Sequence, residues 1–380
     1  MTPPSPEACM ARALQLARHG LYTTHPNPRV GCVVVNAGRI VGEGYHAYAG
    51  GPHAEVHALR EAGDAAAGAT VYVTLEPCSH HGRTPPCAQA LIDAGVRRVV
   101  VAMVDPNPQV AGRGVAMLRE AGIEVDVGLL ATDAEALNVG FVKRMRDGLP
   151  FVRLKMAMSL DGRTAMASGE SQWITGASAR TEVQRLRARA SAVMTGIDSV
   201  IFDNSRLTVR ADQLALEDGE AIARRQPLRV VVDSRLRLPL AAACLREPGR
   251  TLVATCTPDE ARREALSRAG AEVLMLPADE GGRVDLRALL AYLARDEQCN
   301  EVLLETGATL AGAMLDLEAI DEMHLFVAPT LLGGEARPLF ALPGLERMAQ
   351  QRPLHIDDIR AVGQDWRIVA RPSRSAKDEA

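Results

Sequence analysis

The first 150 residues alternate between helical and strand patterns of apolar positions. Apolar residues at helical spacing predict a helix over 7–20, and two apolar runs around Asn-Ala-Gly predict a β-hairpin over 29–46. This alternation predicts an α/β domain. Further helices are expected at 53–63, 87–95, 114–122 and 135–150, and further strands at 69–78, 96–105 and 123–128.

A second α/β alternation begins at residue 151, after the break at Gly148 and Pro150. We therefore predict a first domain at 1–147, a second at 148–372 and a disordered tail at 373–380. The strand patterns of the second domain cover 151–162, 191–196, 228–234, 251–256, 271–277, 301–307, 322–334 and 366–372, and its helical patterns cover 178–190 and 308–318.

The composition argues against several classes of protein. A length of 380 residues favours two domains over one, and 47% hydrophobic residues suffice for two cores. The net charge of −4 lacks the basic balance of a nucleic-acid-binding domain, and no apolar run reaches the roughly 18 residues of a membrane span. Seven cysteines, an odd number, fit a reduced protein better than a disulfide framework. We therefore expect a cytoplasmic protein that binds neither nucleic acid nor membranes.

Two short stretches, "PHAE" and "EPCSHHGRTPPC", have the composition of a catalytic zinc site. His53 and Glu55 are at the start of a predicted helix, Cys78 follows a predicted strand, and Cys87 starts a helix. One imidazole and two thiolates would leave the fourth position of a tetrahedral zinc open for water. A carboxylate that is not a ligand could then shuttle the proton of that water, and zinc deaminases combine these parts.

Other interpretations of these stretches are a disulfide loop, a structural zinc site, and a zincin-like pair of His53 and His57. Zincins need a glutamate directly after the first histidine, where this chain has Ala54. The order of H-x-E, then strand-Pro-Cys, then a cysteine at a helix start favours the catalytic zinc site. Eight residues separate Cys78 and Cys87, instead of the usual two, which points away from cytidine and tRNA-adenosine deaminases.

The stretches "HPNPRVGCVVV", "GPHAEVHAL", "TLEPCSHHGRTPPC" and "DPNPQVAGRG" resemble the deaminase half of a known family, over about residues 7–147. This family is the bifunctional deaminase–reductase of riboflavin biosynthesis. The resemblance implies a cytidine-deaminase-like, three-layer domain that binds zinc through His53, Cys78 and Cys87. It also implies that Glu55 is the proton shuttle.

Four further residues follow from the same resemblance. Asn27 and His46 are expected to contact the pyrimidine, with loop capping as the alternative. His80 and Arg83 could meet the substrate phosphate, with plain solvent exposure as the alternative.

The second domain carries two turns that suit a dinucleotide. In "EVLLETGATLAG" a strand leads into a turn with Gly307 and Gly312, where backbone N–H groups can bind a pyrophosphate. In "VVDSRLR" a strand ends with a hydroxyl group and with Arg235 and Arg237, which suit an adenosine 2′-phosphate and so favour NADP over NAD. Neither turn is specific alone, because many α/β turns look alike and a basic turn can simply be solvated.

Residues 150–370 are similar to the reductase half of the same family, which has a dihydrofolate-reductase-like fold. Lys155 is expected near the reacting carbon, with a lysine that reaches solvent from its strand as the alternative. The resemblance implies an NADPH site lined by Ala157, Trp173, Ser199, Asp203, Ser234, Gly307, Ala308, Thr309, Leu310, Ala311, Gly312 and Ala313. It implies substrate contacts from Ser171, Arg187, Leu207, Arg210 and Glu305.

Three positions depart from the family pattern. Asp198 stands where glycine is expected, Ser205 where proline is usual, and Thr306 where the family has a different residue. Asp198 would weaken cofactor binding if its side chain pointed toward the cofactor.

These observations lead us to expect a two-domain enzyme that acts on phosphoribosylaminopyrimidines. Its zinc domain would deaminate 2,5-diamino-6-(5-phosphoribosylamino)pyrimidin-4(3H)-one, and its NADPH domain would then reduce the ribosyl group to ribityl. Arg187 and Arg210 suit the substrate phosphate, Glu305 suits the ribose hydroxyls, and the family resemblance implies a homo-oligomer, a dimer or a tetramer. The alternatives are another nucleotide deaminase fused to a non-catalytic reductase-like binding domain, and a zinc-stabilised binding module without turnover.

Overall fold

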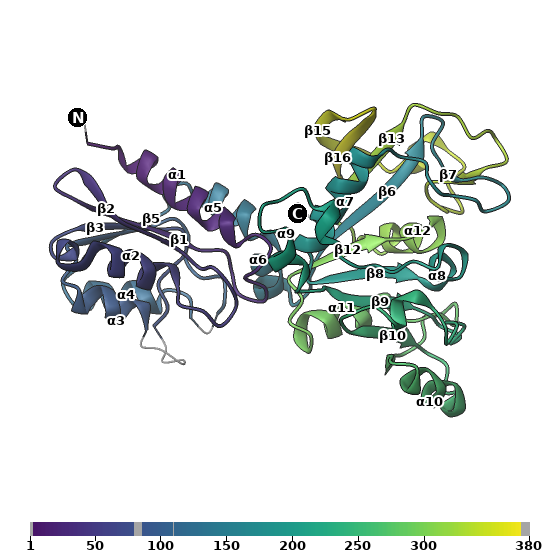
Figure 1. Cartoon of the computed structure of the whole chain (residues 1–380), viewed down its shortest axis with the longest axis horizontal. Coiled ribbons are helices and arrows are strands. Elements are labelled where there is room, and N and C mark those ends of the chain that lie inside the picture. The colour runs from purple at the N-terminus through teal and green to yellow at the C-terminus, as the bar shows by residue number, and fades with distance from the viewer. Residues whose placement is uncertain (1–2, 80–85, 109, 374–380) are drawn as a thin grey trace. The chain divides into compact units, whose positions relative to one another are not determined.

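The structure is a computed structural model of the chain, and it describes residues 3–79, 86–108 and 110–373. The chain divides into two compact units, Met1–Leu149 and Pro150–Ala380 (Figure 1). Each unit is built on a sheet of its own. No helix within the described ranges is long and apolar enough to cross a membrane.

The first unit contains a five-stranded sheet. Strand β1 is antiparallel to both of its neighbours, β2 and β3, whereas β3, β4 and β5 are parallel. In spatial order the strands are β2 (Arg39–Tyr45), β1 (Gly31–Asn36), β3 (Thr70–Val73), β4 (Arg98–Val101) and β5 (Glu124–Val127).

Helices cover both faces of this sheet (Figure 1). Strand β1 separates two cores because its side chains alternate in direction. Cys32 and Val34 pack with one layer of helices, and Val33 packs with the other. This confirms the predicted three-layer α/β arrangement. The first layer holds α2 (Ala54–Ala62), α3 (Cys87–Asp93) and α4 (Arg113–Glu120), and the second holds α1 (Pro6–Ala17), α5 (Ala131–Leu137) and α6 (Val139–Asp147).

Two glycines of β2 allow α2 to lie directly on the sheet. A Cβ atom at Gly44 would overlap the carbonyl oxygen of Ala54, and one at Gly42 would overlap that of Ala58. The first turn of α2, which begins after His53, is therefore held at backbone distance from the strand.

The helix predicted over 135–150 is in fact two helices that meet at Asn138. The Asn138 side chain accepts a hydrogen bond from the Arg29 backbone N–H at 2.8 Å and donates one to the Arg29 carbonyl at 2.9 Å. Side-chain bonds to a distant backbone compete with helix continuation, and here they join the helix break to the segment that carries Asn27.

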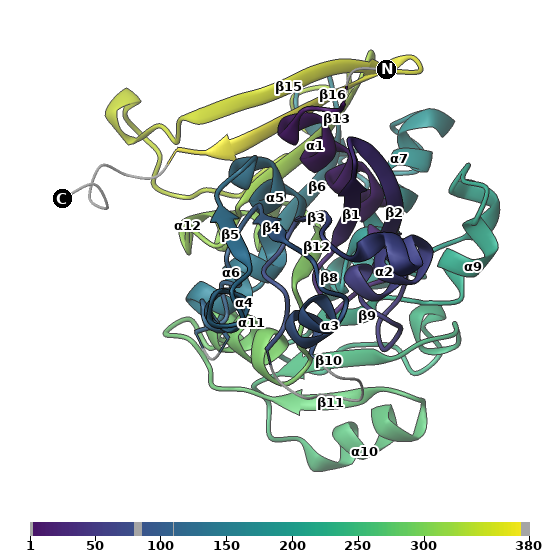
Figure 2. The ribbon, with the colours of Figure 1, turned by 90° about the vertical axis from the view of Figure 1, so that its left-hand side faces the viewer.

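The second unit contains a nine-stranded sheet. Its strands are parallel from β11 to β13, while β16 is antiparallel to β13, and β15 to β16. The β15–β16 hairpin forms one edge (Figure 2). The strands are, in spatial order, β11 (Glu272–Met275), β10 (Thr251–Thr255), β9 (Leu228–Val232), β8 (Ala192–Gly196), β12 (Glu301–Glu305), β6 (Phe151–Ser159), β13 (Glu322–Ala328), β16 (Asp365–Pro372) and β15 (Leu354–Val362).

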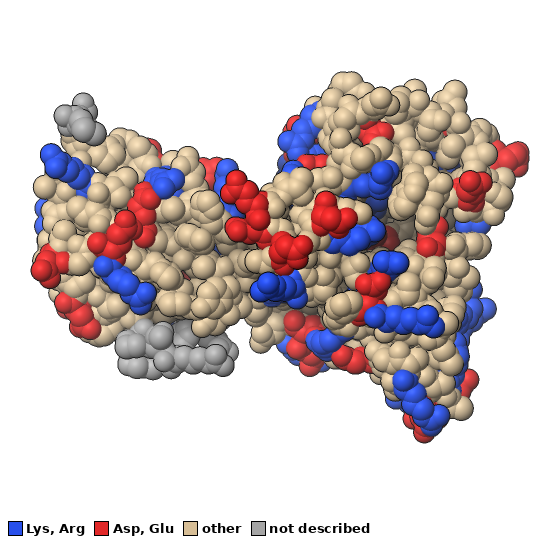
Figure 3. Space-filling view, in the orientation of Figure 1, with Lys and Arg blue, Asp and Glu red and all other residues tan. Residues whose placement is uncertain are grey.

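Helices and a small sheet complete this unit. Acidic and basic side chains are interspersed on the face that Figure 3 draws.

Of the tail predicted at 373–380, residues 374–380 lie outside the described residues. The remaining elements are α7 (Ala177–Arg189), α8 (Ile197–Asp203), α9 (Gly219–Ala223), α10 (Glu260–Arg268), α11 (Leu286–Arg295) and α12 (Ala308–Asp316), with β7 (Arg163–Ala165) paired to β14 (Arg337–Pro338).

A buried ion cluster joins the amino-terminal ends of β6, β12 and β13. The Arg153 guanidinium lies 2.7 Å from a Glu301 carboxylate oxygen and also contacts Glu322. His324 Nε2 lies 2.7 Å from the same Glu322 oxygen. The side chains of Arg153 and Glu301 are only 4% and 1% exposed, so their charges depend on ion pairs within the protein. For Glu301 these pairs include Arg189, at 2.8 Å.

We expect Arg153→Met to lower the unfolding free energy of the second unit by about 3 kcal/mol, because the buried Glu301 carboxylate and the partly exposed Glu322 carboxylate would lose the cation that they share. Urea denaturation followed by circular dichroism measures this change. Arg268→Met is the control, since Arg268 forms an exposed pair with Glu264 and should change stability by less than about 0.5 kcal/mol. Equal effects of the two substitutions would contradict the role given to Arg153.

Candidate functional site

Three metal-ligating side chains converge in the first unit. His53 is the N-cap residue of α2, Cys78 follows β3, and Cys87 is the first residue of α3. His53 Nδ1 lies 3.2 Å from Cys87 Sγ and 3.7 Å from Cys78 Sγ, and all three donor atoms lie within 4.8 Å of one another. Bonds of about 2.0–2.3 Å to a tetrahedral zinc place such donors about 3.5–3.8 Å apart. The three donors therefore fit zinc and leave its fourth position open.

The surroundings of the two thiols favour a bound cation. The Cys87 backbone N–H donates to Cys78 Sγ at 3.3 Å. Hydrogen bonds from Cys87 and His53 lower the pKa of Cys78 and so favour its thiolate. The hydrogen bond to Cys78, together with burial, raises the pKa of Cys87, because a second thiolate beside the first is unfavourable. A divalent cation between the two sulfurs would remove this penalty.

Glu55 lies in the first turn of α2 and is 3% exposed. Its Oε2 atom has no hydrogen-bond partner among the described residues. Burial raises the pKa of Glu55 to about 7. A carboxyl group with this pKa can take up and release a proton near neutral pH, which suits a proton shuttle beside a metal.

His46 and Asn27 form a pair beside these ligands. The His46 ring lies edge-on to that of His53, with centroids 5.4 Å apart. His46 Nδ1 lies 3.0 Å from the Pro52 carbonyl, so this nitrogen carries the proton, and Nε2 accepts from Asn27 Nδ2 at 3.0 Å. Burial lowers the pKa of His46. Both ring nitrogens are thus engaged within the protein, whereas the Asn27 side-chain oxygen makes no hydrogen bond among the described residues.

The remaining polar residues that the sequence places near this centre are His57, His80, Arg83 and Glu76. His57 lies over Gly44 of β2, as a packing residue would. His80 and Arg83 lie outside the described residues. Glu76, which sequence analysis did not single out, is a buried carboxylate two residues before Cys78. The available signal was a glutamate within the strand predicted over 69–78, next to apolar residues and with no lysine or arginine close to it in sequence.

The predicted substrate residues of the second unit lie close together. Lys155 of β6 is paired with Glu305 of β12 in the sheet, and Arg187 of α7 donates to both Glu305 oxygens, at 2.6 and 2.9 Å. Ser171 donates to Asp203 at 2.8 Å. Burial lowers the pKa of Lys155, and the nearby charges of Glu305 and Asp203 oppose this shift. No hydrogen bond or ion pair engages the Lys155 ammonium within the described ranges.

The structure distinguishes the two arginines that were predicted to bind phosphate. Arg187 uses all of its guanidinium nitrogens on Glu305 and on the Thr208 carbonyl. The Arg210 Nε atom is buried without a partner in the described part of the chain, so Arg210 is the arginine with donors left for an anion. The Leu207 side chain is buried in the core, which leaves its backbone as the group that a substrate could contact.

The predicted cofactor residues lie along four strands or just beyond them. Ala157 is in β6, Ser199 is in α8 after β8, Ser234 follows β9, and the turn 307–313 follows β12. The Ser234 hydroxyl accepts the Val284 N–H at 3.0 Å.

The segment 307–313, predicted as a turn, is the N-cap Gly307 followed by the first six residues of α12, and it is most exposed at its start. Gly307 and Thr309 are exposed, and the space where Gly307 would carry a Cβ atom is open. Ala311 and Gly312 are buried, and a Cβ at Gly312 would overlap the Ala341 carbonyl oxygen. The expectation that Gly312 permits approach of a pyrophosphate is therefore corrected, because this glycine serves the packing of α12.

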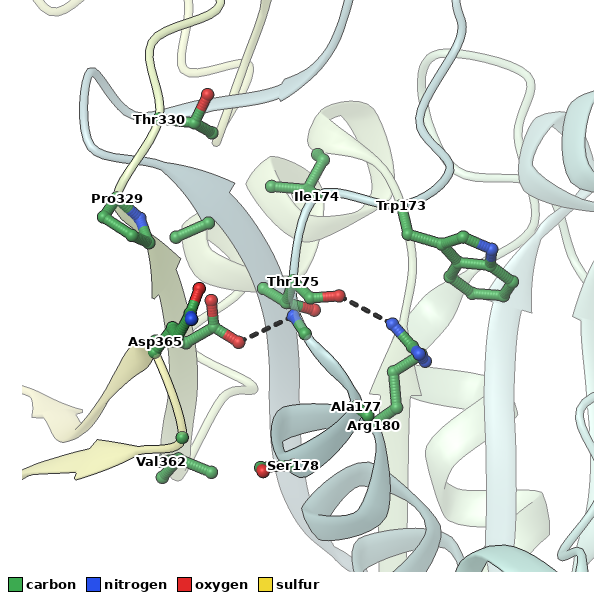
Figure 4. Close-up of a pocket in the computed structure, with 14 residues that line it drawn as sticks. Trp173, Ile174, Thr175, Ala177, Ser178, Arg180, Pro329, Thr330, Val362 and Asp365 are labelled. Carbon is green, nitrogen blue, oxygen red and sulfur yellow. Dashed lines mark hydrogen bonds between the residues drawn. The ribbon is translucent and has the colours of Figure 1, made fainter.

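Trp173 lines a cavity of about 630 Å³. Its ring is 68% exposed and lies 5.0 Å from the Arg180 guanidinium, and Arg180 also donates to the Thr175 carbonyl at 2.8 Å (Figure 4). On the other side Asp365 accepts the Gly176 N–H at 2.8 Å. Thus one predicted cofactor residue faces an open, water-accessible space.

Two of the departures from the family pattern form links between turns. Asp198 is exposed and lies 2.7 Å from Arg237 in the turn after β9. The Thr306 hydroxyl accepts the Gly196 N–H at 3.2 Å, which joins the end of β8 to the end of β12. Ser205 lies in the loop after α8, and nothing in the structure explains it.

Comparisons with known proteins match the two halves of the chain to two different domain families. The family described as the cytidine and deoxycytidylate deaminase zinc-binding region matches residues 4–103, and the RibD C-terminal domain matches residues 150–368. A solved structure of RibD from Acinetobacter baumannii is similar, with a TM-score of 0.89, 49% identity, and coverage of 97% of this chain and 99% of that chain. A deaminase/reductase structure from Thermotoga maritima has a TM-score of 0.83 at 33% identity and covers 97% of this chain and 98% of that chain.

Curated sequences show the same similarity over nearly the full length. The riboflavin biosynthesis protein RibD of Escherichia coli is 52% identical, with 94% of this chain and 97% of that protein covered. RibD of Haemophilus influenzae is 47% identical, with 96% of each covered. These relatives and the zinc-type donor set point to the same conclusion: the chain belongs to the RibD family of bifunctional deaminase–reductases of riboflavin biosynthesis.

Proposed function

We propose that the zinc domain deaminates 2,5-diamino-6-(5-phosphoribosylamino)pyrimidin-4(3H)-one, and that the other domain reduces the product with NADPH to 5-amino-6-(5-phosphoribitylamino)uracil. The observation that carries this proposal is the convergence of His53, Cys78 and Cys87 beside the buried carboxylate of Glu55. The Thermotoga maritima relative supports it, since that protein is described as a diaminohydroxyphosphoribosylaminopyrimidine deaminase and 5-amino-6-(5-phosphoribosylamino)uracil reductase.

In the deaminase domain, His53, Cys78 and Cys87 would hold zinc, which when bound polarises a water molecule at its open position. Glu55 would take a proton from that water and deliver it to the ring and then to the departing amine. Asn27 would accept a hydrogen bond from the pyrimidine through its free oxygen. The water oxygen thereby replaces the amino group, and ammonia leaves.

His46 would act on the pyrimidine through Asn27. Its two nitrogens are engaged by Pro52 and Asn27, so it orients the asparagine side chain. This refines the expectation that both residues contact the ring.

Glu55→Gln should lower the turnover number for ammonia release by about 10²–10⁴-fold, because the amide cannot transfer the proton. Zinc content should remain at one per chain, measured by atomic absorption, and NADPH oxidation with the deaminated intermediate should be unchanged. Cys78→Ser is the contrasting variant, and it should lose both zinc and ammonia release. Ammonia release by Glu55→Gln within about tenfold of wild type would overturn the proton-shuttle role.

In the reductase domain, NADPH when bound supplies the hydride that C1′ of the ribosyl group accepts. Lys155 would donate the proton that the ring oxygen needs when its bond to C1′ breaks, which its free ammonium permits. Arg187 would hold Glu305 in place for the ribose hydroxyls. Arg210 would bind the substrate phosphate, since guanidinium and phosphate form bidentate hydrogen bonds.

We assign the preference for NADPH over NADH to Arg235. This side chain is exposed, and no described residue forms a hydrogen bond or an ion pair with it. Arg237, two residues further on, is held by Asp198 instead. An adenosine 2′-phosphate near the end of β9 would therefore meet Arg235 first, and it would compete with Asp198 for Arg237.

Arg235→Ala should raise the Kd of NADPH by about tenfold through loss of a charged hydrogen bond, and it should leave the Kd of NADH unchanged. Asp198→Asn should tighten NADPH binding a few-fold, because Arg237 is released. Fluorescence titration with both dinucleotides measures these constants. Equal changes for NADPH and NADH would show that the 2′-phosphate binds elsewhere.

Several expectations stay predictions. They are the domain limits 1–147 and 148–372, a cytoplasmic location and a homo-oligomeric state, dimer or tetramer. Half-exposed Leu354, Ile356 and Ile359 on the edge strand β15 support a self-association surface. A different nucleotide deaminase fused to a non-catalytic binding domain is not favoured, because similarity to RibD proteins covers both halves of the chain.

A further inference from the structure

The carboxylate of Glu76 is 4% exposed and is surrounded by backbone N–H groups. Its Oε1 atom accepts from Gly114 at 2.8 Å and from Val115 at 3.1 Å. Its Oε2 atom accepts from Asp105 at 3.1 Å and from Gly112 at 3.0 Å. One side chain thus satisfies four backbone donors that lie 29–39 residues away in the chain.

Helix α4 depends on this distant carboxylate because it has no capping side chain of its own. The first N–H groups of any helix lack partners within the helix, and a polar side chain at the N-cap usually accepts from them. The N-cap of α4 is Gly112, in a left-handed conformation with φ of 77°, and it offers no side-chain acceptor. Glu76 supplies the missing acceptor from the segment that follows β3.

The residue after Glu76 is also fixed against α4. A Cβ atom at Gly114 would overlap the carbonyl oxygen of Pro77, so the start of α4 and the peptide before Cys78 are in backbone contact. Cys78 in turn is joined to α3, since its carbonyl accepts the Ala88 N–H at 3.1 Å and its sulfur accepts the Cys87 N–H at 3.3 Å. Residues 76, 77 and 78 are therefore each fixed by a neighbouring helix.

We propose that Glu76 is a positioning residue for the zinc centre. By fixing the segment between β3 and Cys78 on α4, it sets where Cys78 Sγ lies relative to His53 and Cys87. This inference rests on the proposed zinc function. Groups that orient metal ligands typically change metal affinity or activity 10–100-fold when they are altered, whereas a cap that only stabilises α4 would leave the affinity of the folded protein unchanged.

Glu76→Gln tests the proposal in the full-length enzyme. The amide keeps the size of the side chain but replaces one acceptor oxygen with an NH₂ group that faces N–H donors. We expect zinc affinity, measured by competition with a chelator, to fall about 10–100-fold. We also expect the turnover number for ammonia release to fall, while NADPH oxidation with the deaminated intermediate stays at the wild-type rate.

Asn36→Ala is the matched control in the same unit. It also removes side-chain hydrogen bonds to the backbone, from Asn36 Nδ2 to the carbonyls of Ala65 at 2.8 Å and Ala67 at 3.1 Å. It should lower the melting temperature and leave zinc affinity unchanged. Glu76→Asp, which keeps the charge but shortens the reach, should fall between wild type and Glu76→Gln, and it replaces the Gln variant if that variant does not fold.

Zinc affinity of Glu76→Gln equal to that of wild type, with only a lower melting temperature as in Asn36→Ala, would reduce Glu76 to a helix cap and overturn the proposal. If Glu76→Asp has to stand in, unchanged zinc affinity in that variant has the same meaning. A wild-type protein that holds no zinc and releases no ammonia would instead refute the proposed deaminase function, and the role of Glu76 with it.

Discussion

The candidate zinc site of the first unit depends on one constraint: donor atoms from three separate segments must lie within 4.8 Å of one another. His53 is 25 residues from Cys78 and 34 from Cys87, so no local turn could assemble the set. Close contact between α2 and β2 through Gly44 fixes the histidine, and the end of β3 and the start of α3 fix the two thiols. The same close packing buries Glu55 and raises its pKa to about 7. The ligand set and the proposed proton shuttle therefore have one structural origin.

The candidate site of the second unit lies where the parallel strands of its sheet end. Parallel strands bring their carboxyl ends to one edge, where ligands of open α/β sheets bind. There the Arg187–Glu305 pair neutralises itself, and Arg210 keeps an unpaired guanidinium nitrogen. Lys155 and Arg235 have no ion-pair partner within the described residues. Basic side chains without an acidic partner suit anionic ligands, namely a phosphorylated substrate and a dinucleotide.

Sequence patterns predicted the helices and strands of the first unit, apart from the break at Asn138, and most strands of the second unit together with α7 and α12. They did not predict α8, α9, α10 and α11. Apolar periodicity predicted the helices that begin near His53 and at Cys87, and the strands that carry Lys155 and Glu305. The residue types and their order in the sequence indicated the three candidate zinc ligands. Contacts between distant segments could not be predicted this way. Glu76 binds N–H groups up to 39 residues away, and Asn138 breaks a helix through bonds to Arg29.

Other differences between the sequence-based predictions and the structure also arise from contacts between distant segments or from exposure. Gly312 was predicted to allow a pyrophosphate to approach the backbone. In the structure it packs against the Ala341 carbonyl, and this contact between distant segments is not visible in the sequence. Arg187 looked like a phosphate ligand, but tertiary structure pairs it with Glu305. Strand β15 was not predicted because it is an edge strand with both faces largely exposed, so its sequence lacks the alternation that burial of one face imposes.

We propose that both halves act in sequence on one substrate. We would give the purified protein the undeaminated pyrimidine phosphate with NADPH and follow ammonia release and NADPH oxidation in the same sample. We expect ammonia to appear first, ammonia and oxidised NADPH to reach equal amounts, and Glu55→Ala to yield neither. Ammonia release without NADPH oxidation in the wild type, or NADPH oxidation by Glu55→Ala, would contradict it.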